Sequence, residues 1–193
     1  DATSLDHPAE DYTRDLEKGV QGMRIAIPRE YFGEGLSAAV KDRILKTAAI
    51  YEKLGAELVD VSMESVKSAL AAYYVISSAE ASSNLARFDG IRYGYRAAEY
   101  ADIDDLYKKT RSEGFGREVK RRIMLGSFAL SSGYYDAYYK RALQVRTLIM
   151  NDFKRVFDRC DVIMSPVAPT TAYGLGEKCS DPLEMYMGDI YTV

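Results

Sequence analysis

The sequence is poor in the residue types that build metal centres and disulfide frameworks. Its 193 residues include one histidine and two cysteines, and tryptophan is absent. His7 has no second histidine near it, and Cys160 and Cys179 are too far apart to form a Cys-x-x-Cys ligand pair. Two cysteines fit free thiols in a reducing, cytoplasmic compartment. The sequence therefore predicts neither a metal site nor a disulfide scaffold.

Long apolar runs and a surplus of basic charge are also missing. No stretch approaches the roughly 18 apolar residues of a membrane helix, and the first residues are too polar for a secretory signal. The net charge of −3 argues against a large, general nucleic-acid-binding face. Neither a phosphate-binding glycine loop nor a Gly-x-Ser-x-Gly nucleophile elbow occurs. Membrane proteins, P-loop enzymes and serine–histidine hydrolases are thereby disfavoured.

The apolar pattern predicts an α/β protein. Residues 23–28 and 57–61 alternate like short strands, and the segment 37–54 between them has apolar residues three and four positions apart, as in a helix. Ser37 is placed to cap this helix, and Gly55 suits its left-handed C-cap. A strand–helix–strand order favours parallel pairing through a right-handed crossover.

Helices dominate the remaining residues, and one more strand is expected. Helices are predicted over 65–85, 102–112, 116–130 and 135–158, a strand over 161–165, and the start of a last helix at 181–182. We interpret the chain as a single partial domain, because three strands are few against a usual sheet of about five. Its parts are a leader loop (1–22), a βαβ unit (23–62), a helical region (63–160), and a strand, loop and incomplete helix (161–193).

Three charged residues are candidates for binding a small polar ligand. Arg121 and Arg122 are adjacent on a predicted helix, where neighbours point about 100° apart. We therefore expect one to face solvent and the other to point inward, where a guanidinium needs an anionic partner such as a carboxylate. Asp189 lies in a mostly apolar stretch and likewise requires a cation or several donors. Spacing alone leaves open whether these groups pair with protein charges or with a ligand.

Tyrosine is unusually frequent. The chain contains 16 tyrosines, several of them in adjacent pairs such as Tyr73-Tyr74 and Tyr134-Tyr135. A tyrosine buries a large ring and keeps a polar tip. The pairs fit either a half-buried helical surface or a pocket with polar edges.

Several segments together resemble one family. They are residues 3–8, 11–13, 24–31, 78–85, 87–94, 161–166 and 185–192, and the most specific of them is 111–139, with the sequence RSEGFGREVKRRIMLGSFALSSGYYDAYY. They resemble the A subunits of the glutamyl-tRNA(Gln)/aspartyl-tRNA(Asn) amidotransferases, which belong to the amidase signature family. The resemblance covers essentially the whole chain. It implies that the chain is the carboxy-terminal half of an α/β/α sandwich, with a mixed sheet flanked by helices.

The resemblance also implies an activity for the intact protein. A subunits of this kind hydrolyse glutamine and release ammonia. A B subunit, which uses ATP and Mg, passes the ammonia to glutamate or aspartate misacylated on tRNA, and a C subunit supports the pair. The family's lysine, bridging cis-serine and nucleophilic serine belong to a Gly/Ser-rich stretch that precedes the matching region. We therefore expect no catalytic residue and no cofactor in this chain, and no activity from it alone.

The resemblance assigns part of a glutamine pocket to this chain. Arg122 corresponds to the arginine that holds the substrate α-carboxylate, Asp189 to the aspartate that holds the α-ammonium, and Tyr73 to a tyrosine that lines the pocket. A one-residue slip would exchange Arg121 with Arg122 or Tyr73 with Tyr74. Two alternatives are a stand-alone amide hydrolase of the same family, which needs no zwitterion pocket, and a non-catalytic module for ligand binding or subunit interaction.

Overall fold

The sheet is small and parallel. In a computed structural model, which describes residues 4–176 and 186–193, strand β1 (Arg24–Pro28) lies between β2 (Glu57–Val61) and β3 (Val162–Ile163). Both pairings are parallel, which confirms the predicted βαβ unit. The mixed pairing expected of the sheet is not seen among these described strands.

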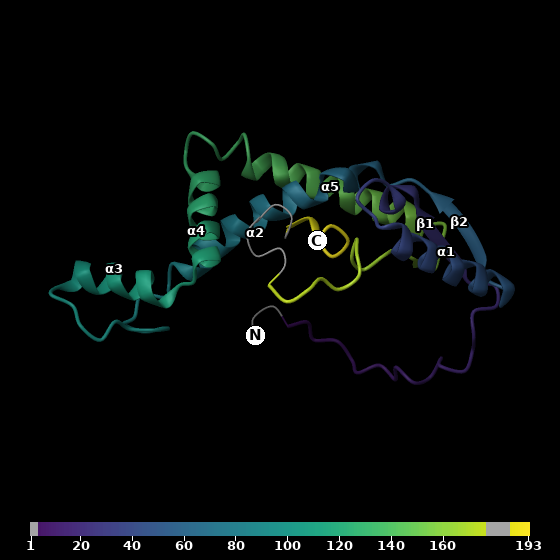
Figure 1. The fold of residues 1–193 in the computed structure, drawn as a ribbon, viewed down its shortest axis with the longest axis horizontal. Helices are drawn as coiled ribbons and strands as arrows, with labels where there is room; N and C mark the ends of the chain where they lie inside the picture. Colours follow the sequence, from purple (N-terminus) through teal and green to yellow (C-terminus); the bar gives the residue numbers. More distant parts are fainter. Residues whose placement is uncertain (1–3, 177–185) are drawn as a thin grey trace.

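The helices follow the sequence prediction closely (Figure 1). The described residues form helices α1 (Ala38–Lys53), α2 (Ala69–Leu85), α3 (Ile103–Gly114), α4 (Arg117–Leu130) and α5 (Tyr139–Phe157), and the 3₁₀ segments η1 (Arg29–Phe32) and η2 (Glu64–Ser68). The Ser37 hydroxyl caps α1 by accepting from the Val40 amide, and Gly55 has a φ of 95°, the left-handed conformation expected after a helix. The predicted helix start at 181–182, like Cys179, lies outside the described residues.

Two boundaries differ from the prediction. The helix expected from residue 65 begins with the tighter turn η2 and becomes α-helical only at Ala69. The helix expected from residue 135 begins at Tyr139, so that part of the prediction was wrong. Tyr134 and Tyr138 instead pack on Phe128 at the end of α4, with ring centres 4.2 and 5.7 Å away. Aromatic contacts thus hold the chain in turns before α5 starts.

Helices cover both faces of the sheet. Side chains alternate between the faces of a strand, so Ile25 and Ala26 point in opposite directions. Ala26 packs in the buried core with Val156 of α5, whereas Ile25 lines a cavity with Tyr51 of α1. Helices α1 and α5 therefore lie on opposite faces, which gives the expected α/β/α layers. Cys160 lies in the same core, and burial raises the pKa of its thiol.

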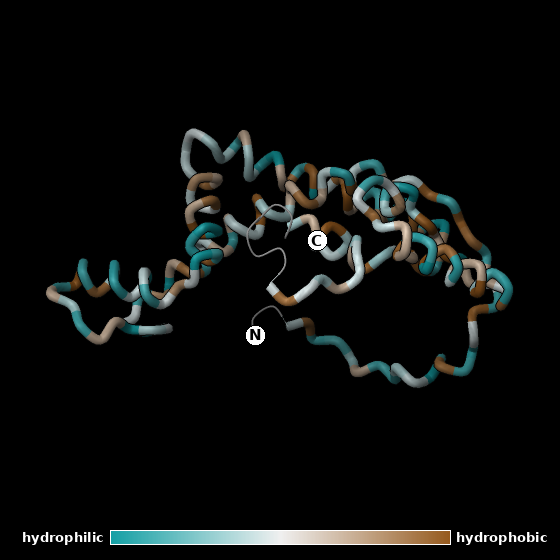
Figure 2. The backbone as a smooth tube through the Cα atoms, in the orientation of Figure 1, coloured by the Kyte–Doolittle hydropathy of each residue, from teal (hydrophilic) through white to brown (hydrophobic). Residues whose placement is uncertain are grey.

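The remaining parts extend away from this core. Helix α3 lies at the far end of the molecule from the sheet, and residues 4–22 run as an irregular, exposed arm along the lower side of the view (Figure 1). The arm is mostly hydrophilic, with isolated apolar positions (Figure 2). His7 is exposed on it, as expected. None of the helices in the described residues is long and apolar enough to cross a membrane.

Candidate functional site

The candidate site forms where α2, α4 and the C-terminal turn meet. Helix α4 approaches α2 through Gly126, because a Cβ atom built there would lie 1.9 Å from the Ser78 carbonyl oxygen. One helical turn earlier on each helix, Arg122 lies over Tyr74, with its guanidinium carbon 5.3 Å from the ring centre. This distance is typical of a cation–π contact. The missing side chain at Gly126 thus allows the approach that places Arg122 against Tyr74.

Glu118 organises the basic end of the site. Its carboxylate accepts a hydrogen bond from Arg122 Nε (3.2 Å), from Arg121 Nη1 (2.8 Å) and from the Tyr186 hydroxyl. The expectation that one arginine faces solvent and the other points inward was wrong, because the side chains of Arg121 and Arg122 are 32% and 30% exposed. A glutamate reaches residues three and four positions further along a helix, so Glu118 holds both.

Asp189 marks the acidic end. Its carboxylate accepts a hydrogen bond from the Tyr74 hydroxyl at 2.7 Å. Burial and this hydrogen bond raise the pKa of Tyr74 well above its ordinary value, so the phenol stays protonated as a donor. Within the part of the chain that the structure describes, Asp189 forms no ion pair with a lysine or arginine. Arg122 and Asp189 thus both contact Tyr74, one its ring and the other its hydroxyl, without pairing with each other.

Tyr73 lies beside this group. Its ring meets Tyr74 edge-on, with centres 5.0 Å apart, and it is 37% exposed. Burial lowers the pKa of Arg122, but hydrogen bonding to Glu118 and to Tyr73 and the nearby charges raise it overall. Tyr73 also lines an apolar groove of about 380 Å³ between α2 and α5, together with Ile149. The residue in contact with Asp189 is therefore Tyr74, and the pocket role of Tyr73 stays a prediction.

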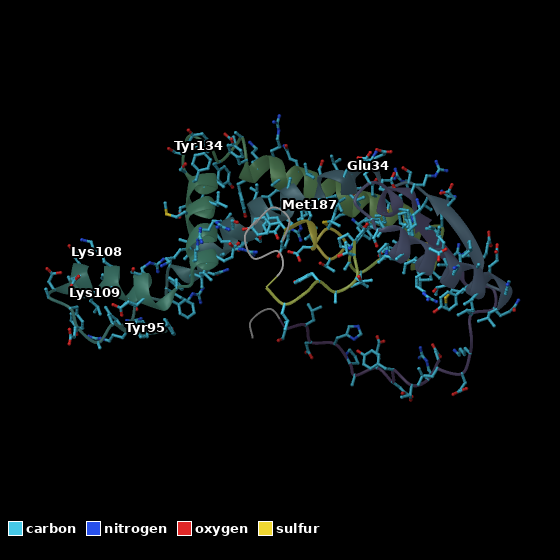
Figure 3. The ribbon with its side chains drawn as sticks, in the orientation of Figure 1. Glu34, Tyr95, Lys108, Lys109, Tyr134 and Met187 are labelled. Carbon is cyan, nitrogen blue, oxygen red and sulfur yellow. The ribbon has the colours of Figure 1, made fainter. Side chains whose placement is uncertain are left out.

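Two residues of the site were missed from the sequence. Glu118 had a local signal, since a glutamate three and four positions before two arginines is placed to pair with both. Tyr186 had none, because it reaches Glu118 across 68 residues of chain. Its ring packs at a tilt on Tyr74, with the ring centres 4.2 Å apart. Figure 3 shows Met187, the next residue, in the C-terminal turn at the middle of the molecule, far from Lys108 and Lys109 on α3.

The site is a cluster of charged and phenolic groups. It joins two guanidinium groups, two carboxylates and two phenols at the meeting point of three segments. In the described ranges, no group of three His, Cys, Asp or Glu side chains could hold a metal ion. The separated positive and negative groups can bind a molecule that carries both charges.

Comparison with known proteins identifies the family. The amidase family model matches residues 1–193, so the chain belongs to the amidase family. It is 58% identical over 193 residues to the glutamyl-tRNA(Gln) amidotransferase A subunit of Dechloromonas aromatica (strain RCB), and equally to that of Thermoanaerobacter pseudethanolicus (strain ATCC 33223 / 39E). Each match covers 100% of this chain and 40% of the relative. The chain thus spans two fifths of the length of these relatives.

Solved structures agree with the fold. The crystal structure of the glutamyl-tRNA(Gln) amidotransferase A subunit from Thermotoga maritima superposes with a TM-score of 0.71 at 36% identity, over 100% of this chain and 37% of that one. A bacterial aryl acylamidase of the amidase signature family superposes with a TM-score of 0.63 at 21% identity, over 84% of this chain and 30% of that one. The second likeness concerns the fold alone.

Proposed function

We propose that the intact protein containing this chain is the glutamine-hydrolysing A subunit of a tRNA-dependent amidotransferase. The relatives that match the whole chain carry that name. The observation that carries the proposal is the arrangement of Arg122 and Asp189, which both contact Tyr74 yet leave their charges unpaired with each other. Free glutamine is a zwitterion, so its backbone end requires one cation and one anion at separate positions.

Binding in this pocket would orient the substrate for reaction. The Arg122 guanidinium suits the α-carboxylate, which it can hold by two parallel hydrogen bonds, and Asp189 suits the α-ammonium. With both ends held, the side-chain amide points to one place, and positioning of this kind lowers the barrier to reaction. In the proposal, a serine and a lysine from the family's upstream segment perform the chemistry. The serine attacks the amide, ammonia leaves, and water hydrolyses the glutamyl ester.

In this proposal, the released ammonia is used by a second subunit. A B subunit uses ATP and Mg to activate glutamate or aspartate misacylated on tRNA, and the ammonia converts it to the amide. A C subunit supports the complex, misacylated tRNA is held mainly by the B subunit, and the assembly works in the cytoplasm. The names of the relatives support a tRNA-linked, multi-subunit enzyme.

The test compares two substrates in the intact protein assembled with its partners. Arg122→Ala should lower kcat/KM for glutamine by about 30-fold or more, because removing one partner of a hydrogen-bonded charge pair costs about 2–5 kcal/mol. Turnover of a simple primary amide without the zwitterion should be unaffected. Arg117→Ala, an exposed arginine on the same helix, is the matched control.

The same measurement separates the alternatives. A stand-alone amide hydrolase would turn over simple amides well and would not depend on Arg122. A non-catalytic module would leave the intact protein without glutaminase activity. If Arg122→Ala leaves glutamine turnover at the level of Arg117→Ala, the pocket assignment is wrong.

A further inference from the structure

We propose that Glu118 is a positioning residue that holds both ends of the amino-acid pocket in place. The inference rests on the proposed function and adds a residue to it. Glu118 accepts hydrogen bonds from Arg122, which we assign to the carboxylate end, and from Tyr186, which belongs to the turn that carries Asp189. A single carboxylate on α4 thereby fixes two recognition groups that lie 67 residues apart in the chain.

At the first end, Glu118 determines which nitrogens of Arg122 face a ligand. A guanidinium has five N–H donors in a fixed plane. Glu118 occupies Nε at 3.2 Å, so this bond leaves the two terminal nitrogens of Arg122 for Tyr73 and for a ligand. These two nitrogens form the fork that binds a carboxylate by parallel hydrogen bonds. In the proposal, Glu118 thus keeps the fork of Arg122 available to a ligand carboxylate.

At the second end, Glu118 anchors the turn that presents Asp189. The Tyr186 hydroxyl donates to Glu118, and the Tyr186 ring packs at a tilt on Tyr74, with the ring centres 4.2 Å apart. The Asp189 amide donates to the Tyr186 carbonyl at 3.0 Å, so both residues belong to one hydrogen-bonded turn. Tyr74 then reaches Asp189 directly at 2.7 Å. The carboxylate of Asp189 is therefore held from two directions, by Tyr74 and through Tyr186.

Glu118 also sets the charge of the pocket. Arg121 and Arg122 are neighbours, and without an anion their charges would add at the carboxylate end. Glu118 offsets one of them, and with Asp189 the four groups sum to zero, which matches a zwitterion. Burial raises the pKa of Glu118, but hydrogen bonds from Tyr186 and Arg122 and the nearby arginine charges outweigh burial and lower it. The group is therefore a carboxylate at neutral pH.

The experiment is a double-mutant cycle in the intact protein with its partner subunits. Glu118→Gln should raise KM for glutamine about 10- to 100-fold, the usual effect of losing a hydrogen bond to a charged group, and leave kcat for a simple primary amide unchanged. Glu64→Gln removes an exposed glutamate that pairs with Lys67 and should match wild type. If Glu118 acts through Arg122, adding Glu118→Gln to Arg122→Ala should lower the preference for glutamine over an analogue without the α-carboxylate little further than Arg122→Ala alone does.

Two substrate analogues read the two ends separately. Glutaramic acid lacks the α-amino group, and 4-aminobutanamide lacks the α-carboxylate. Tyr186→Phe should narrow mainly the preference for glutamine over glutaramic acid, because it removes the bond between the Asp189 turn and Glu118 and keeps the bond between Glu118 and Arg122. Glu118→Gln should narrow the preference for glutamine over glutaramic acid and also the preference for glutamine over 4-aminobutanamide. Glu118→Asp keeps the charge and should restore part of each preference.

The outcomes distinguish the two proposals. A Glu118→Gln variant that loses simple-amide turnover as much as glutamine turnover has a general structural defect, and the positioning role is then wrong. The role is also wrong if the effects of Glu118→Gln and Arg122→Ala on the preference for glutamine over 4-aminobutanamide multiply in the double variant. It is wrong as well if Glu118→Gln behaves like Glu64→Gln while Arg122→Ala is defective. If Arg122→Ala itself spares glutamine, the proposed function fails first.

Discussion

A methyl group added at Gly126 should disturb the pocket from outside it. In Gly126→Ala, the new Cβ would lie 1.9 Å from the Ser78 carbonyl oxygen and 2.5 Å from its carbon. These are backbone atoms that no rotamer change can move away, so α4 and α2 would have to separate by roughly 1 Å, as expected for a close-packed interior. Alanine favours a helix over glycine by about 1 kcal/mol, but overpacking costs about 1–3 kcal/mol, and more against backbone. We therefore expect a net loss of stability.

The separation should also be visible in function. Arg122 lies one turn from Gly126, so the same shift moves its guanidinium relative to Tyr74. A misplacement of about 1 Å can cost on the order of 10²-fold in rate. The assays are denaturant unfolding and glutamine kcat/KM of the intact protein. Gly133→Ala, at an exposed position where a Cβ meets nothing within 4 Å, is the control. Wild-type stability and kinetics in Gly126→Ala would refute the idea that this contact sets the pocket.

Two further predictions concern single hydrogen bonds. Tyr74→Phe removes the donor to Asp189 and should cost about 1–3 kcal/mol in free energy of unfolding. Because folding raises the pKa of Tyr74, the hydroxyl stabilises the fold fully below the ordinary tyrosine pKa, and this stabilisation is lost as pH rises through the pKa of the folded state. The difference in free energy of unfolding between wild type and Tyr74→Phe should therefore shrink in denaturation experiments at strongly alkaline pH. A difference that grows there would contradict this. Asp152, which is 7% exposed, accepts from the Ser65 amide at 3.0 Å, so Asp152→Ala should destabilise by about 1–3 kcal/mol in urea, whereas Asp136→Ala, at an exposed position, should not.

The order and type of the elements could be predicted because local signals agree with the tertiary structure. The helix starting after Ser37 combines a cap, a regular apolar stripe and a left-handed glycine at its end, and each signal is used as expected. The start of α5 was missed because the tyrosines before it follow contacts with Phe128, which lies on another element. Helix periodicity records only the face a segment buries, and it cannot show that a distant ring will hold the chain in a turn.

The candidate site was predictable in part. Arg122 and Asp189 were singled out because a charge in an apolar stretch requires a partner, and the resemblance to a family gave them roles. Their actual partners, Glu118 and Tyr74, depend on how α4 crosses α2 and on where the C-terminal turn lies. Such contacts arise from tertiary packing, so the sequence alone cannot show which of two adjacent residues makes them.

The order of the strands in the sheet bears on where the site lies. After β1, the chain adds β2 on one side of β1, and it later adds β3 on the other side. The direction in which strands are added therefore changes between β1 and β3, although all three strands are parallel. In open α/β sheets, such a topological switch point leaves a crevice outside the carboxyl ends of the strands, where ligands commonly bind. Tyr31, just after β1, contacts Tyr191 with ring centres 5.7 Å apart. The turn that carries Asp189 is therefore packed against the segment that follows the carboxyl end of β1, which links the site to the sheet as well as to the helices.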